Sequence, residues 1–239
     1  MRERLLASFF VFTAVTISSG IAFADVQGST NNNASIDIPD ASVAGVPAST
    51  STITITENEI IEEVNFSIEG LAHTWVGDLV ATVTHVQSGR SVTLFSRILR
   101  DNPNFGVGDE SNFQGDYVFS DATNNGLWEE AARGQTNYVL RTTEGDPDDP
   151  QTNPGIYNAA AYNAAAGLTG APISINDAFA GISTQGEWVL DLSDRNATQV
   201  GSFREFSVEF TTTAVPEPST FVWLIAAATA GIGIRRRRS

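Results

Sequence analysis

The 239-residue chain contains no cysteine and only two histidines, His73 and His85. Without cysteine it can neither form disulfides nor act as a thiol enzyme. Neither histidine lies in an HExxH pattern and no GxSxG pattern is present, so the familiar zinc-protease and serine-hydrolase motifs are missing. We therefore expect a protein without catalytic activity. A carboxylate pair for glycoside hydrolysis remains open, because acidic residues are too numerous for any one pair to stand out.

Lysine is also absent, so the 13 basic residues are all arginines, against 28 acidic residues. Six of these arginines lie near the two chain ends, which leaves a strongly acidic body within a net charge of -15. Such a body should repel nucleic acid and anionic lipid, and we expect no nucleic-acid partner. It suits divalent cations, although a simply well-solvated surface would have the same composition.

The first 24 residues have the parts of a secretory signal peptide. Two arginines precede an apolar run over residues 5–21, and the small-residue motif AFA follows at 22–24. This arrangement predicts cleavage by signal peptidase between Ala24 and Asp25. The mature protein should therefore be exported through the inner membrane.

The C-terminal residues 215–239 form a second tripartite segment. A Pro-Glu-Pro motif is followed by an apolar run over 221–234 and then by an arginine cluster. A helix of that length reaches ~21 Å and only marginally spans a bilayer core of ~30 Å. The positive cluster should stay on the cytoplasmic side. The residues concerned are Pro216, Glu217, Pro218, Arg235, Arg236, Arg237 and Arg238.

This tail resembles the PEP-CTERM sorting signal of Gram-negative bacteria. The resemblance implies recognition by an exosortase, removal of the tail at or near the Pro-Glu-Pro motif, and a location at the cell surface or outside the cell. It also implies an association with exopolysaccharide and biofilm matrix. A plain tail anchor, held in the membrane by the C-terminal helix, is the alternative.

The body of the chain alternates apolar and polar residues with a period of two. The pattern is clear in segments 52–56, 62–70, 78–85, 186–194 and 204–210, which are separated by turn residues. It predicts an all-β protein in which two antiparallel sheets pack face to face. We expect the sandwich over residues 53–212, after a flexible leader over 25–52. The irregular region at about 99–180 is expected to consist mainly of loops. Within it, the sequence of residues 140–172 gives the weakest indication of secondary structure.

The order of motifs in the body resembles the P domain, or Homo B domain, of subtilisin-like proprotein convertases. The resemblance covers 53–211 and implies a jelly-roll-like sandwich of about eight strands that accompanies a serine protease, although no protease domain is present in this chain. The matching residues are His73, Thr74, Trp75, Gly77, Asp78, Leu79, Gly89, Phe179, Gly181, Gly186, Trp188, Leu190, Asp194 and Gly201.

The His73 and Asp78 pair could suggest chemistry, but we interpret it as structural. Asp78 follows Gly77 in the turn that begins a strand, where an aspartate can cap the loop. His73 should end the previous strand and hydrogen-bond to a neighbouring loop, and His85 should lie on the polar side of its own strand. Trp188 is expected in the core, whereas Trp75 and Trp128 could pack loops or bind sugar.

Calcium is the expected ligand, if the protein binds one. The segment 106–125 combines acidic and amide side chains with glycines, as calcium loops do, although it lacks the EF-hand spacing. A solvated acidic loop with Asx turns is the alternative. The candidate ligands are Asp78, Asp109, Asn112, Asp116 and Asp121.

Taken together, these features predict a non-catalytic surface or extracellular-matrix protein with a structural, adhesive or binding role. Its expected partners are signal peptidase and an exosortase, with exopolysaccharide or a subtilisin-like protease as further partners. The alternatives are an accessory domain that acts with such a protease and a carbohydrate-binding module.

Overall fold

The structure is a computed structural model that describes residues 23–30, 34–40, 48–98, 108–127, 131, 138–140, 156–157, 159–163 and 168–213. The expected sorting tail and the apolar run of the expected signal peptide lie outside the described residues, as does Trp128. Within the described part of the chain, no helix is long and apolar enough to cross a membrane.

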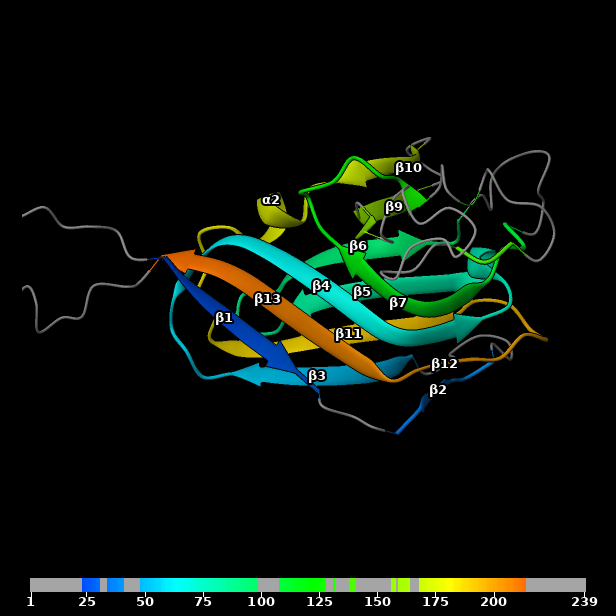
Figure 1. Cartoon of the computed structure of the whole chain (residues 1–239), viewed down its shortest axis with the longest axis horizontal. Helices are drawn as coiled ribbons and strands as arrows, with labels where there is room; N and C mark the ends of the chain where they lie inside the picture. The colour runs from blue at the N-terminus through cyan, green and yellow to red at the C-terminus, as the bar shows by residue number, and fades with distance from the viewer. Residues whose placement is uncertain are drawn as a thin grey trace, which may run out of the picture.

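Two sheets pack face to face (Figure 1). Sheet A is built around the 14-residue strand β4, which pairs with β13 and β12 on one side and with β7 on the other. β1 lies outside β13, β2 lies outside β12, and β8 runs parallel to the end of β7. The strands of sheet A are β1 (Phe23–Ser29), β2 (Ile36–Ile38), β4 (Ile60–His73), β7 (Phe113–Phe119), β8 (Ile156–Tyr157), β12 (Gly201–Phe203) and β13 (Glu205–Thr213).

Sheet B contains four antiparallel strands in the order β3-β11-β5-β6. A two-stranded sheet of β9 and β10 lies beside it, with β9 in contact with β6. The strands are β3 (Ser49–Ile55), β5 (Leu79–His85), β6 (Arg90–Ser96), β9 (Ala159–Asn163), β10 (Leu168–Ile173) and β11 (Gly186–Asp194). The 3-10 turn η1 (Val76–Asp78) and the short helix α2 (Ile175–Phe179) join strands.

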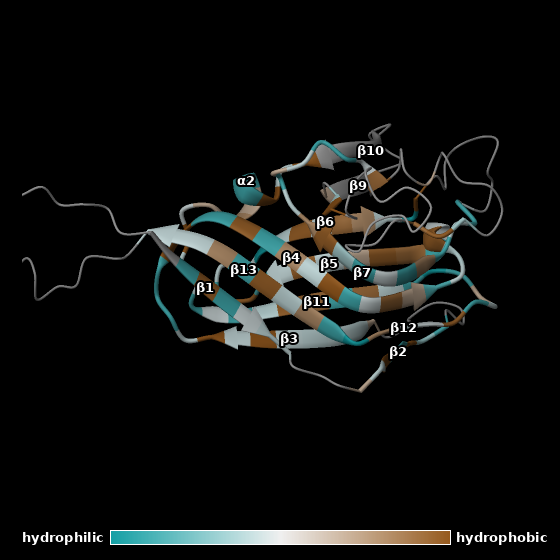
Figure 2. Cartoon of the chain, in the orientation of Figure 1, coloured by the Kyte–Doolittle hydropathy of each residue, from teal (hydrophilic) through white to brown (hydrophobic). Residues whose placement is uncertain are grey.

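The sandwich predicted from alternation is confirmed. In β3 every second residue is buried and the others are exposed, and Figure 2 shows the same banding along the central strands of both sheets. The two main sheets hold eleven described strands rather than about eight, because pieces of two or three residues (β2, β8 and β12) also pair. Apolar side chains from both inner faces form one continuous core.

Aromatic side chains fill the middle of this core. Trp188 on β11 is fully buried, as expected, with its ring centroid 5.0 Å from those of Phe179 and Phe210 and 6.0 Å from that of Phe66. Its indole N–H donates to the Thr184 carbonyl at 3.0 Å, so burial leaves this polar group satisfied.

Three local expectations differ from the structure. The leader over 25–52 contains β1, β2 and the start of β3, and Val26 and Ile38 are buried in the core. Part of the irregular region instead forms the β9–β10 pair. His85 is 2% exposed on the inner face of β5, because it has the same parity as the buried residues Leu79, Ala81 and Val83.

The first and last described residues lie side by side at one end of the sandwich (Figure 1). β1 and β13 are antiparallel, and their register places Phe23 opposite Thr213. The other end of the sandwich is formed where β4 ends at His73, beside β12, η1 and the end of β11.

Candidate functional site

A buried His–Asp pair closes the sandwich at the end away from the chain termini. His73 is the last residue of β4 in sheet A, and Asp194 is the last residue of β11 in sheet B. Their side chains are 0% exposed, with 3.1 Å between Nε2 of His73 and Oδ2 of Asp194. This hydrogen bond joins the two sheets, and its acceptor lies at the end of a strand, whereas the sequence predicted a partner in a neighbouring loop.

Both ring nitrogens of His73 are used in this arrangement. Nδ1 accepts a hydrogen bond from the backbone N–H of Trp75 at 3.1 Å, so Nε2 carries the proton that Asp194 accepts. A catalytic histidine held by an aspartate needs its second nitrogen free to face a nucleophile. Here that nitrogen faces the backbone of the adjacent turn, which gives His73 a structural role.

Asp78 lies next to this pair, in η1, and is completely buried. Its Oδ2 accepts from the side chain of Asn196 at 3.4 Å, and its Oδ1 lies 3.9 Å from a terminal nitrogen of Arg97. Burial raises the pKa of Asp78; the Asn196 hydrogen bond opposes this rise, the Asp194 charge adds to it, and Arg97 and His73 oppose it. Within the described residues Oδ1 has no hydrogen-bond partner, so the carboxylate is only partly compensated.

The backbone of η1 is pressed against the segment that carries Asp109. The N–H of Gly77 donates to the Asp109 carbonyl at 3.0 Å, and an added Cβ on Gly77 would lie 2.6 Å from Gly108 Cα. Only glycine permits this approach. Asp109 is itself 5% exposed and folds back as an Asx turn, with Oδ1 accepting from the Ser111 amide at 2.8 Å. Its burial raises the pKa of its carboxyl group, against the opposing hydrogen bonds from Ser111.

The other expected calcium ligands are engaged separately. Asp116 Oδ1 accepts from the Gly70 amide at 2.7 Å, and Asp121 accepts from the hydroxyl of Ser174 and from two amides at the start of α2. The structure therefore does not bring the predicted set together. Among the described residues, no group of three or more histidines, aspartates or glutamates is arranged to hold a metal ion.

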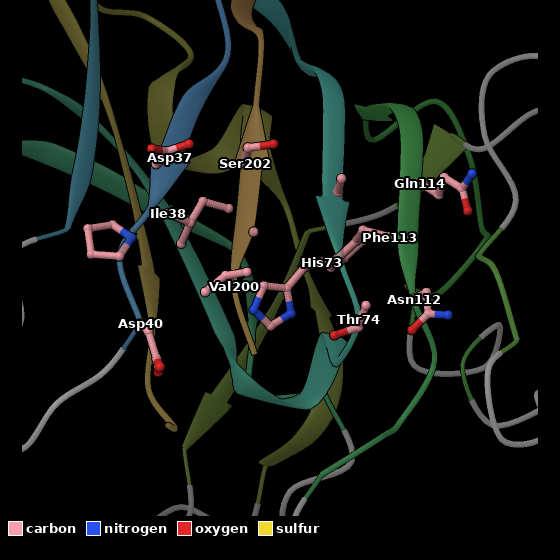
Figure 3. Close-up of a pocket in the computed structure, with 13 residues that line it drawn as sticks. Asp37, Ile38, Asp40, His73, Thr74, Asn112, Phe113, Gln114, Val200 and Ser202 are labelled. Carbon is pink, nitrogen blue, oxygen red and sulfur yellow. The ribbon is translucent and has the colours of Figure 1, made fainter. Parts of the chain in front are cut away.

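A groove of about 730 Å³ opens above the His73 end of sheet A (Figure 3). Pairing between neighbouring strands places four residues in a row across the groove. Asp37 on β2 is opposite Ser202 on β12, and Ser202 is opposite Ala72 on β4. Ala72 is in turn opposite Gln114 on β7. Asp37, Ala72 and Gln114 are exposed and Ser202 is half-buried. The small Ala72 side chain lies between the polar ones.

The rim and wall of the groove add further polar groups. Thr74, Asn112 and Asp40 line it together with Val200, which is 71% exposed. The Asn112 Oδ1 is buried and has no hydrogen-bond partner among the described residues. Of the groove residues, sequence reasoning singled out Asn112, as a calcium ligand, and His73, Thr74 and Gly201, within the family motif. The others lie on different strands, and their proximity depends on a register that the sequence does not show.

The second histidine is also structural. His85 stacks on Trp188 with ring centroids 4.5 Å apart, and its Nε2 donates to the Gln185 carbonyl at 3.1 Å. Its Nδ1 then accepts from the Ser88 hydroxyl at 2.9 Å. Burial lowers the pKa of His85, partly offset by the Gln185 hydrogen bond.

Residues 214–238 match the PEP-CTERM protein-sorting motif. The motif marks an exported protein of Gram-negative bacteria that an exosortase processes for a surface or extracellular location. No curated protein sequence matches the chain.

Two solved structures are similar to the body. One is the Aeromonas sobria serine protease in complex with its chaperone ORF2, with 12% identity, a TM-score of 0.37 and coverage of 81% of this chain and 28% of that one. The other is the Aeromonas sobria serine protease itself, with 13% identity, a TM-score of 0.35 and coverage of 80% and 27%. The chain thus spans less than a third of the length of those chains.

Proposed function

We propose that this protein is a non-catalytic surface or extracellular-matrix module, built on a sandwich like the P domain and released or transferred after exosortase processing. The observation that carries this proposal is the hydrogen bonding of His73. One of its ring nitrogens holds the opposite sheet and the other holds a backbone turn. The polar residue that most resembles a catalytic group therefore serves the fold.

We further propose that the groove above Ala72 is the contact surface of the module. Its lining combines carboxylate, amide and hydroxyl groups, which can both donate and accept hydrogen bonds. Among the described residues, this lining contains no arginine, and its one histidine, His73, is paired with Asp194, so the groove suits a hydroxyl-bearing or cationic partner better than an anion. An uncharged extracellular polysaccharide fits this description.

A hydrolysis assay tests the absence of catalysis. The purified protein should release no peptides from casein above the level of a buffer control. Activity that disappears in His73→Ala, while a variant of an exposed residue such as Glu187→Ala keeps it, would overturn the proposal. Release of peptides only after a subtilisin-like protease is added would favour the accessory role instead.

Processing is tested in cells that contain an exosortase. Glu217→Ala alters the Pro-Glu-Pro motif and should leave the tail attached, so that the protein keeps the higher mass of the unprocessed form. Glu187→Ala makes the same chemical change on an exposed position of β11 and should be processed normally. Equal processing of both variants would show that the motif is not the recognition element.

Binding at the groove is tested by co-sedimentation with extracellular polysaccharide from the producing bacterium. Ala72→Arg places a long side chain on the groove floor and should reduce the bound fraction. Thr52→Arg, on the exposed face of β3, adds the same charge elsewhere and should bind as the unmodified protein does. If the two variants bind equally, the groove is not the contact surface.

A further inference from the structure

The register of β1 and β13 fixes where the two membrane-directed segments leave the body. Phe23 is opposite Thr213 and Ala24 is opposite Thr212, so these residues are direct antiparallel neighbours. Opposed Cα atoms in such a ladder are ~4.5–5.5 Å apart. The apolar run over 5–21 and the sorting motif at 214–238 are therefore attached to one end of the sandwich.

Several other segments meet at this end of the sandwich. Ile60, at the start of β4, is paired with Thr213 and also forms a bridge to Ser183. The segment that follows Ser183 leads into β11, where the Glu187 carbonyl accepts from the Val86 amide at 2.9 Å. The turn after β5 thus belongs to the half of the molecule that carries the chain termini.

The groove lies at the far end of the same strand. β4 has 14 residues and runs from Ile60, opposite Thr213, to His73, opposite Gly201. At ~3.3 Å per residue the strand covers ~46 Å. By contrast, the seven residues 214–220 between β13 and the apolar run reach at most ~25 Å even when fully extended. The tail therefore holds the Thr213 end within ~25 Å of the bilayer, whereas the groove end can lie up to ~46 Å further away.

Charge opposes a position in which sheet A lies flat on the membrane. Its outer face carries Glu69, Glu205 and Glu209, which line one shallow depression. Arg204 on the same face is engaged by Glu69 at 3.3 Å and lies 3.8 Å from Asp116. Anionic headgroups are repelled by such a surface.

We propose that, before the tail is removed, the sandwich stands on the bilayer with the Phe23–Thr213 end toward the lipid and the groove toward the exterior. The Phe23–Thr213 end would face the surface of the same bilayer that contains the protein's own C-terminal apolar run. This inference rests on the proposed function, because it requires the sorting tail to act as an anchor. Its consequence is that the groove is presented for binding while the chain is still attached.

Single-cysteine labelling tests this orientation, and the absence of natural cysteine makes each introduced thiol unique. Val86→Cys and Val200→Cys are matched changes at positions that are 47% and 71% exposed, in the half near the termini and beside the groove respectively. The chain from Asp25 to Ser239, which lacks the apolar run over 5–21, is reconstituted in phosphatidylethanolamine–phosphatidylglycerol vesicles, labelled with a donor dye, and measured against an acceptor on the lipid headgroups. Energy transfer from position 86 should exceed that from position 200 by about twofold or more, since their heights differ by tens of ångströms.

Equal transfer from the two positions, or stronger transfer from position 200, would overturn the orientation. Vesicle flotation separates this failure from failure of the proposed function. A chain that does not float with the vesicles is not anchored by its tail, which removes the premise of both proposals. A chain that floats but gives equal transfer is anchored and lies flat.

Discussion

Nε2 of His73 and Oδ2 of Asp194 lie 3.1 Å apart and join the ends of two strands from opposite sheets. The residues are 121 positions apart in the sequence, so this contact joins segments from the early and late parts of the sandwich. Asp194 is also held in place locally, because its Oδ1 accepts from the Asn196 amide at 2.9 Å.

Removal of the imidazole should therefore be costly. We expect His73→Ala to lower the free energy of unfolding by about 3–5 kcal/mol, because it leaves Asp194 buried without its partner. The measurement is urea unfolding followed by fluorescence. In a cycle with Asp194→Ala, the double variant should be less destabilised than the sum of the single variants; effects that add to within ~0.5 kcal/mol would contradict a direct interaction.

Gly77→Ala tests the close approach of η1 to the segment before β7. The new methyl group would overlap the backbone at Gly108 and Asp109, and neither backbone can move aside without breaking the Gly77 hydrogen bond. We expect a loss of about 3 kcal/mol or more in chemical denaturation. Gly89→Ala is the control: it has open space around the new Cβ but a φ of +68°, and should cost only about 1–2 kcal/mol. Similar losses in both variants would show that backbone crowding at Gly77 is not decisive.

Ionisation of the buried Asp78 carboxyl group should lower the free energy of unfolding as the pH rises. Burial raises its pKa in the folded protein above the ordinary value of 3.8, so the native state keeps a proton that the unfolded chain has already released. The contribution of this group is most favourable below the unfolded pKa and is lost as the pH rises through the folded pKa. Asp78→Asn cannot titrate, so its stability relative to the unmodified protein should increase from about pH 4 toward neutrality. A difference that stays constant over a series of urea titrations would refute the shift.

His85 has the opposite pH dependence. Burial lowers its pKa below 6.5, so protons bind to the unfolded chain before they bind to the native protein. The contribution of neutral His85 to the free energy of unfolding is fully present above pH 6.5. It is lost as the pH falls toward the pKa of His85 in the folded protein. His85→Gln should be less stable at neutral pH by about 0.5–1.5 kcal/mol, because the stack on Trp188 is lost. This deficit should shrink below pH 6.5, and a deficit that does not change with pH would argue against buried neutral histidine.

Asp121 should stabilise the protein through hydrogen bonds whether or not calcium is present. Its carboxylate accepts from the amides of Ile175 and Asn176 at the start of α2. We expect Asp121→Ala to lower the melting temperature, at a cost of about 1–2 kcal/mol, as for loss of a helix cap. The loss should be the same in millimolar calcium and in EGTA. A loss seen only with calcium would instead support a metal role for Asp121.

The sequence predicted the sandwich because the longer strands alternate without interruption. β3 and β5 place every second side chain in the core, and the pattern is readable in both. The short strand β2 has only three residues, and a period of two cannot be recognised over that length. β1 combines charged, polar and glycine residues on an edge where little is buried, so its sequence favours a flexible leader over a strand.

The site was harder to predict than the fold. Sequence alone indicated that His73 would bond to a neighbouring loop, but its partner is determined by how the ends of β4 and β11 meet. The acidic segment suggested calcium because its residues are close in sequence. In three dimensions successive carboxylates point to different neighbours: Asp109 to Ser111, Asp116 to Gly70 and Asp121 to α2.

Strand β13 lies between β1 and β4, and this placement sets an order of events during export. Among the described strands, β1, the first in the chain, pairs only with β13, the last, so we expect β1 to remain unpaired until β13 has been exported. The bond between Ala24 and Asp25, where we expect signal peptidase to cut, belongs to that waiting strand. We therefore expect signal peptidase, if it binds its substrate in extended form, to cut this bond before β1 pairs with β13.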